Sequence, residues 1–218
     1  REVLLQAARN PALDVAIVSG RALADVKQMV NVPGLTYVGD HGFTIEGPGL
    51  TFQHEALADT AAALDRASQA LAALDVPGAW VERKAATLAL HLRHVADADV
   101  RRVERDAERI LRRLGLHTLR GKRIVEGRPP VEWHKGRAVL YLLARRHGAD
   151  WASRVRALYI GDDVTDEDAF ESLHGIGRSI CVAAPAHTST ADLRLPDPDA
   201  VIQLLRWLAA GGFAASAG

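Results

Sequence analysis

The sequence is poor in several residue types. It has 218 residues, with one cysteine, one methionine and 5% aromatic residues. A single cysteine, Cys181, excludes an internal disulfide, and its neighbours in SICVAA indicate a buried strand rather than a nucleophile. Lys plus Arg and Asp plus Glu number 27 each, so there is no excess positive charge of the kind that binds nucleic acid or an anionic membrane. No apolar run approaches the ~18 residues of a membrane span. We therefore expect a cytoplasmic protein with no nucleic-acid or membrane partner.

What the sequence does contain is an ordinary globular composition, with 48% hydrophobic and 25% charged residues. The N-terminal part predicts a buried strand at Asp14–Val18, a helix at Arg21–Val30 and a second strand at Leu35–Val38, which together form a βαβ unit. The same pattern resumes after Pro130. There we expect a helix at 135–147, strands at 155–161 and 179–182, and a helix at 200–210.

The middle of the chain differs in texture. Two helices are predicted, one Ala-rich at 55–74 and one rich in Arg and Glu at 97–114, and four short strands are predicted at 80–84, 88–92, 116–119 and 123–125. Such strand–helix pairs can form a lid with an antiparallel sheet. We therefore predict an α/β fold with a Rossmann-like core, a mostly parallel sheet and an inserted α/β cap. The expected ranges are 1–46 and 126–210 for the core, 47–125 for the cap and 211–218 for a frayed tail.

An acidic loop is the most distinctive segment. Residues 158–171 read LYIGDDVTDEDAFE, an apolar run that ends at Gly161 and is followed by Asp162, Asp163 and Asp166. Thr165 and Asp168 have the spacing of a capping box at a helix start. The loop thus follows the carboxyl end of a strand, where ligands bind in open α/β sheets. Converging carboxylates favour Mg²⁺; the alternative is a solvated acidic loop at a helix N-terminus.

Three other loops are expected at the same edge. Ser19-Gly20-Arg21 follows the first strand and could cradle a phosphate, or Ser19 could simply cap the next helix. Gly39-Asp40-His41-Gly42 follows the second strand, where a lone histidine is more often structural than catalytic. Lys135 opens a helix after a proline-rich loop and, taken singly, is typical of a surface lysine.

Taken in order, the four segments resemble a known group of enzymes. VAIVSGR, YVGDHG, EGRPPVEWHKG and YIGDDVTDEDAF are similar to the haloacid-dehalogenase-like phosphatase superfamily, and most of all to the trehalose-6-phosphate phosphatases. The resemblance implies a Mg²⁺-dependent phosphomonoesterase that releases trehalose and phosphate. Ser19 and Lys135 would contact the phosphoryl group, assisted by Gly20 and Arg21. Asp162 would bind Mg²⁺ directly, with Asp163 and Asp166 completing or supporting the metal site.

The resemblance also implies sugar-binding residues in the cap. Glu82-Arg83-Lys84, His91-Leu92-Arg93 and a segment containing Glu126 match the family pattern, so that Glu82, Lys84, Arg93 and Glu126 would bind the substrate. The alternative is a set of exposed ion pairs, each worth little. The sequence departs from the pattern at Leu92, His134 and Thr44, which concerns fine substrate preference.

The first motif of the superfamily, Asp-x-Asp-Gly-Thr, has no counterpart before Ser19. In the superfamily it supplies the nucleophile and the general acid, and its strand is the central one. We therefore expect a natural protein that extends upstream of Arg1, a 218-residue chain that is inactive alone, and a gap between Val15–Ser19 and Val155–Gly161.

Two alternatives remain open. One is a phosphatase for another sugar phosphate, and the other is a non-catalytic domain that binds sugar phosphates. The expected partner is a sugar-phosphate substrate, and a sugar-phosphate synthase could be encoded nearby or fused to the chain.

Overall fold

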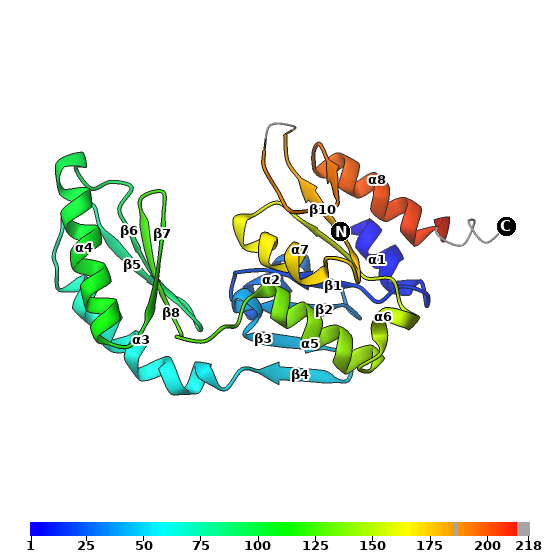
Figure 1. The fold of residues 1–218 in the computed structure, drawn as a ribbon, viewed down its shortest axis with the longest axis horizontal. Helices are drawn as coiled ribbons and strands as arrows, with labels where there is room; N and C mark the ends of the chain where they lie inside the picture. The colour runs from blue at the N-terminus through cyan, green and yellow to red at the C-terminus, as the bar shows by residue number, and fades with distance from the viewer. Residues whose placement is uncertain (185–186, 213–218) are drawn as a thin grey trace. The chain divides into compact units, whose positions relative to one another are not determined.

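The chain forms two compact units. The computed structural model describes residues 1–184 and 187–212. The core unit comprises Arg1–Phe52 and Trp133–Gly218, and the inserted unit, Gln53–Glu132, lies between these stretches in the sequence. The predicted mixed α/β fold is confirmed (Figure 1). Most of the tail expected to fray, residues 213–218, lies outside the described residues.

The first sheet of the core unit has the order β1-β2-β3-β4. β1 and β2 are parallel and are joined by α2, and β3 runs antiparallel to β2 after a short 3-10 turn, η1. β3 and β4 were not predicted, because the Gly-Pro-Gly segment between them was interpreted as the end of the βαβ pattern rather than as the turn of a hairpin. The elements are β1 Ala16–Val18, α2 Leu23–Val30, β2 Thr36–Gly39, η1 Asp40–Gly42, β3 Thr44–Gly47 and β4 Leu50–Gln53.

The second sheet of the core unit has the order β11-β10-β9, and both of its pairings are parallel. A 3-10 turn, η2, and α7 connect β9 to β10, and α5 lies beside α7 (Figure 1). Gly136 permits this close approach, since a Cβ there would lie 2.2 Å from the Asp168 carbonyl oxygen. The elements are α5 Lys135–His147, α6 Trp151–Arg154, β9 Leu158–Gly161, η2 Val164–Asp166, α7 Glu167–Leu173, β10 Arg178–Val182 and β11 Leu193–Leu195. α1 Glu2–Arg9 and α8 Pro198–Ala209 pack against each other.

β1 and β9 are the terminal strands of their sheets, and each is hydrogen-bonded to a strand on one side. The prediction that the strand at Asp14–Val18 is buried is wrong, because Ala16 is exposed and Ile17 and Val18 are only partly buried. On β9, Leu158 is 40% exposed. A terminal strand presents a row of backbone donors and acceptors at its outer edge.

The inserted unit has a four-stranded antiparallel sheet with the order β5-β6-β8-β7, and two helices lie against it. All six predicted elements are present. On α4, Val103, Ala107 and Leu111 are spaced by four residues and form a buried apolar stripe, with Glu108 buried beside it, while Arg side chains occupy the exposed faces. The elements are α3 Ala56–Ala72, β5 Trp80–Arg83, β6 Leu88–His91, α4 Asp97–Arg113, β7 His117–Gly121 and β8 Ile124–Arg128.

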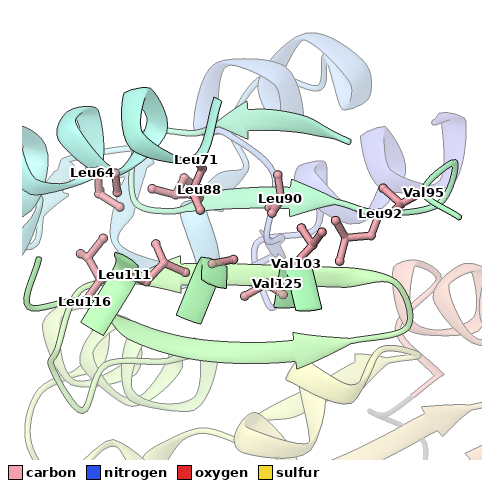
Figure 2. Packing of buried hydrophobic residues seen from close by; sticks show 12 residues of the cluster. Leu64, Leu71, Leu88, Leu90, Leu92, Val95, Val103, Leu111, Leu116 and Val125 are labelled. Carbon is pink, nitrogen blue, oxygen red and sulfur yellow. The ribbon is translucent and has the colours of Figure 1, made fainter. Parts of the chain in front are cut away.

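One hydrophobic cluster fills the space between these helices and the sheet. Figure 2 shows Leu64 and Leu71 from α3 and Leu111 from α4 together with Leu90 and Val125 from the sheet. The cluster contains twelve buried residues, so the inserted unit has a single continuous core. Buried hydrophobic residues of the core unit form three smaller clusters instead. Within the described residues, no helix combines the length and the apolar character needed to cross a membrane.

Candidate functional site

The loop after β1 is a tight turn built on Ser19. The Ser19 Oγ accepts a hydrogen bond of 3.1 Å from the Arg21 backbone N–H, and the Ser19 N–H donates to the Val38 carbonyl at 2.9 Å. Ser19 does not cap the following helix, because α2 begins at Leu23. Gly20 lets the His41 ring lie close to the backbone of this turn, since a Cβ would lie 2.4 Å from that ring. The simple N-cap interpretation of Ser19 is therefore wrong.

The loop after β2 is joined to this turn by the backbone. The His41 N–H donates to the Ser19 carbonyl at 3.2 Å, and the Asp40 N–H donates to the Arg21 carbonyl at 2.7 Å. Thr44, a departure from the family pattern, donates through its hydroxyl to Asp40 at 2.8 Å. The parallel pairing of β1 and β2 thus brings both loops to one edge of the sheet, as predicted.

Lys135 is the first residue of α5 and is 5% exposed, so the interpretation as a surface lysine is wrong. Its ammonium group donates to Asp166 Oδ1 at 2.8 Å. Just before it, the Trp133 indole N–H donates to the Gly42 carbonyl at 2.9 Å, which attaches the start of α5 to the loop after β2. The segment from Trp133 to Lys135 therefore links the second and fourth predicted loops.

Asp166 is the centre of a buried hydrogen-bond network. Its Oδ1 accepts from Lys135 and from the Tyr159 hydroxyl at 2.6 Å, while its Oδ2 accepts from the backbone N–H groups of Asp162 at 3.1 Å and Asp163 at 3.0 Å. Burial alone raises the pKa of Asp166, but the hydrogen bonds from Lys135 and Tyr159 outweigh it, and the pKa lies below its ordinary value. Burial and the neighbouring Asp166 carboxylate raise the pKa of Tyr159. Asp166 thus holds the acidic loop in shape.

Asp162 and Asp163 are exposed at the carboxyl end of β9. Asp163 Oδ1 accepts from the Val164 N–H at 2.7 Å, and together with Asp166 it forms the capping box of this turn. The predicted box between Thr165 and Asp168 is wrong, because the chain first forms a 3-10 turn capped by Asp163, and α7 begins one residue later than a Thr165 cap implies. Of the three predicted metal ligands, Asp162 and Asp163 keep their carboxylates at the surface.

A different group of potential metal ligands lies nearby in the sequence. Glu167, Cys181 and His187 place one ligand atom each within 4.8 Å of one another. Cys181 is buried in β10, as predicted, and Glu167 is fixed by hydrogen bonds from the Thr190 backbone N–H at 2.8 Å and hydroxyl at 2.7 Å. A thiol, an imidazole and a carboxylate suit Zn²⁺ better than Mg²⁺. In the described part of the chain, the three predicted acids are not gathered into such a group.

In the inserted unit, the predicted sugar-binding residues include a short chain of polar contacts. Glu82 Oε2 lies 3.0 Å from His91 Nε2 and 3.5 Å from Lys84 Nζ. Partial burial alone raises the pKa of Glu82, but the contacts with His91 and Lys84 lower it below its ordinary value. Glu126 lies on β8, and Arg93 is exposed in the turn after β6. Glu82 and Glu126 each pair with the same residue of β6, Ala89, and so share one face of the sheet.

The comparison with known families decides the relationship of this chain. A sequence model described as trehalose-phosphatase matches residues 1–199. The chain belongs to the trehalose-phosphatase family. The resemblance found in the sequence motifs is thereby confirmed.

Named relatives agree with this family. The chain is 38% identical over 192 residues to a trehalose-phosphate phosphatase of Mycobacterium bovis. The aligned region covers 85% of this chain and 46% of the relative. It is 37% identical over 172 residues to one of Mycobacterium marinum, covering 77% and 44%. An uncharacterised glycosyl hydrolase of Mycobacterium tuberculosis is 38% identical over 204 residues, covering 89% of this chain and 15% of the relative. The chain thus spans less than half the length of these curated relatives.

Solved structures show the same fold. A trehalose-6-phosphate phosphatase related protein aligns with a TM-score of 0.78 at 23% identity, covering 98% of this chain and 88% of the other. The trehalose-6-phosphate phosphatase of Aspergillus fumigatus aligns with a TM-score of 0.65 at 25% identity, covering 96% and 83%. The trehalose-phosphatase fold therefore accounts for nearly the whole described chain.

Sequence reasoning missed three residues that organise the site. Tyr159 and Trp133 each donate a hydrogen bond that holds a site loop, and Trp80 stacks on His91 in the inserted unit. Tyr159 lies in the strand directly before the acidic loop, and Trp80 lies two residues before Glu82 on the same strand face. The period-two alternation of strands is the signal that could have found Trp80.

Proposed function

We propose that this chain carries most of the active site of a Mg²⁺-dependent phosphatase that converts trehalose 6-phosphate to trehalose and phosphate. The observation that supports it most is a continuous path of hydrogen bonds through the four loops. His41 bonds to Ser19, Trp133 bonds to Gly42, and Lys135 bonds to Asp166. A hydroxyl, an ammonium group and two exposed carboxylates are thereby held in one connected structure, as phosphoryl chemistry requires.

The two phosphate-binding roles follow from the contacts. Ser19 Oγ already accepts from the Arg21 N–H, so its own hydroxyl proton remains for donation to a phosphoryl oxygen. The Lys135 ammonium supplies positive charge that offsets the charge of the transferring group. Asp166 is a positioning residue, because it holds Lys135 and shapes the acidic loop.

Asp162 and Asp163 would hold the Mg²⁺. Their exposed carboxylates are the hard donors that this cation takes, whereas Asp166 is buried, receives two protein donors on each oxygen and would support the site from behind. When bound, Mg²⁺ supplies charge neutralisation at the phosphoryl oxygens. Two carboxylates are fewer than the ligands Mg²⁺ needs, so water, substrate or further carboxylates would complete the set.

The nucleophile in this proposal is an aspartate of a segment preceding Arg1. Covalent phosphoryl transfer needs an activated carboxylate, and the sequence has no Asp-x-Asp-Gly-Thr motif before Ser19. The strand carrying it would pair with the outer edges of β1 and β9, since within the described chain neither strand is paired there. On this proposal the 218-residue chain binds substrate but does not turn it over.

Phosphate release tests the proposal. A longer protein that includes the natural upstream sequence should release phosphate from trehalose 6-phosphate in the presence of Mg²⁺, the 218-residue chain should not, and Lys135→Ala should greatly reduce release by the longer protein. Faster release from another sugar phosphate in a panel would reassign the substrate. Saturable binding without release by the longer protein would make it a sugar-phosphate-binding domain. Release by the 218-residue chain would refute the assignment of the nucleophile.

A further inference from the structure

One face of the sheet in the inserted unit carries several polar and aromatic groups, with Leu119 and Ile124 among them. α3 and α4 cover the opposite face, where Leu88, Leu90 and Val125 enter the core (Figure 2). Side chains alternate between the faces of a strand. Trp80 and Glu82 of β5, His91 of β6 and Glu126 of β8 therefore lie on the face away from the helices.

This face has two adjacent rows across the strands. Trp80 is paired with His91 in one row, and Glu82 and Glu126 flank Ala89 in the next. An aromatic row thus lies beside a row with two carboxylates. Lys84, just beyond β5, adds an ammonium group 3.5 Å from Glu82.

The Trp80 ring is fixed in orientation. It stacks on the His91 imidazole with the centroids 3.8 Å apart and an interplanar angle of 9°. His91 is in turn held by Glu82, whose Oε2 lies 3.0 Å from its Nε2. β5 is the edge strand of the sheet, and Trp80 remains 50% exposed. A single exposed aromatic residue is common on protein surfaces. Here, however, the Trp80 ring stacks on His91, and the side chains of Glu82 and Lys84, which can hydrogen-bond to hydroxyls, lie on the same part of the sheet.

We propose that Trp80, backed by His91, is a stacking platform for a hexopyranose ring of the substrate. The inference rests on the proposed function and adds a residue that the family motifs do not contain. A pyranose ring has an apolar C–H face and a rim of hydroxyls. The indole face attracts the C–H groups, while the neighbouring Glu82 accepts from hydroxyls and Lys84 donates to them. The aromatic row thus suits the apolar C–H face of the sugar, and the row with the carboxylates suits its hydroxyls.

The test is binding of unphosphorylated trehalose and of trehalose 6-phosphate to the 218-residue chain. Saturation-transfer NMR reports contact with the sugar C–H protons, and calorimetry gives Kd. We expect Trp80→Ala to weaken binding of both ligands about five- to thirtyfold, a range typical of an aromatic stacking contact, and Trp80→Phe to retain most of the affinity. Trp207→Ala is the matched control, because Trp207 is 52% exposed on α8 of the core unit, and it should bind as the wild type does.

Three outcomes would overturn the platform. If Trp80→Ala binds both sugars like the wild type while Glu82→Gln and Glu126→Gln weaken them, the platform is wrong and the proposed function stands. If the wild type binds neither sugar, the platform and the proposed substrate both fail. Should Trp80→Ala lose its fold by circular dichroism, Trp80→Leu replaces it, and wild-type affinity in that variant would equally reject stacking.

Discussion

The two units of the molecule differ in how completely their interiors are closed. The inserted unit, about 80 residues long, has one sheet, two helices and a single cluster of twelve buried hydrophobic residues. The core unit is longer, yet its described buried hydrophobic residues form three clusters, the largest with seven residues, and its described strands form two separate sheets. Amphipathic elements that bury their faces against each other suffice for the first unit. In the core unit, among the described residues, β1 and β9 stand at the ends of separate sheets and each is hydrogen-bonded to a strand on one side only.

The units also differ in where they place charge. In the inserted unit, the ion pairs keep at least one side chain at the surface, as in Arg102 with Asp99 and in the exposed Arg120 with the buried Glu108. In the core unit, the Lys135–Asp166 pair has side chains that are each 6% exposed, and it joins two loops of the candidate site. A buried pair is weak evidence for stability as such, but removing one partner leaves an uncompensated charge. The buried ion pair of the core unit thus holds the candidate site in place, whereas the inserted unit is built around a single hydrophobic cluster.

The largest expected effect comes from breaking that buried pair. Lys135→Met should lower the free energy of unfolding by about 3–5 kcal/mol, because Asp166 would be left buried without its cation. Urea unfolding at pH 7, followed by circular dichroism, measures this loss. A loss below about 1 kcal/mol would mean that solvent reaches Asp166 readily.

A matched pair of strand substitutions compares the two interiors directly. Val125→Ala on β8 removes a fully buried side chain from the single cluster and should cost about 2 kcal/mol. Val18→Ala on β1 removes a partly buried side chain that packs at the margin of two clusters, and should cost about 1 kcal/mol or less. The same urea measurement on both variants tests the comparison. Equal losses would contradict the view that the core unit is less closed.

Acid should weaken the core unit through Asp166. Its pKa in the folded protein lies below the ordinary value, so its stabilising contribution is fully present above the unfolded pKa of about 3.9 and is lost as the pH falls through the folded pKa. We expect the stability difference between the wild type and Asp166→Asn to be constant from pH 7 to about 5 and to shrink below about 4. Unfolding curves across this range provide the measurement.

The smallest effect is expected at the surface of α4. Arg102 has a side chain that is 56% exposed and contacts Asp99 at 2.9 Å and Asp106 at 3.8 Å. Arg102→Ala should change the free energy of unfolding by less than about 1 kcal/mol, because exposed pairs gain little in water. A larger loss in the urea assay would show that the charges of α4 act as a network.

Much of this arrangement could be predicted from the sequence. Lys135–His147 was predicted with its observed bounds, and the two helices of the inserted unit were placed within two residues, because their apolar spacing is strongly helical. β3 and β4 were missed, since a hairpin of four-residue strands carries a weak periodic signal. The prediction that β1 is buried was wrong, because burial depends on the neighbouring strands, and the apolar composition of a segment does not reveal them.

The candidate site, too, could be predicted only in part. The order of the motifs was sufficient to indicate the family and to name Ser19, Lys135 and the acidic loop. It did not indicate that both oxygens of Asp166 accept hydrogen bonds within the protein, from Lys135, Tyr159 and two backbone N–H groups. Nor did it indicate that Trp80 stacks on His91.

By itself, then, the sequence determined the element types, the family and the identity of the polar groups, because these depend on local periodicity and on residue chemistry. The tertiary structure decided which of these groups are buried, which are paired and which remain exposed for a ligand. Those properties arise from contacts between residues far apart in the chain, such as Lys135 with Asp166, and no local pattern encodes the distance between them.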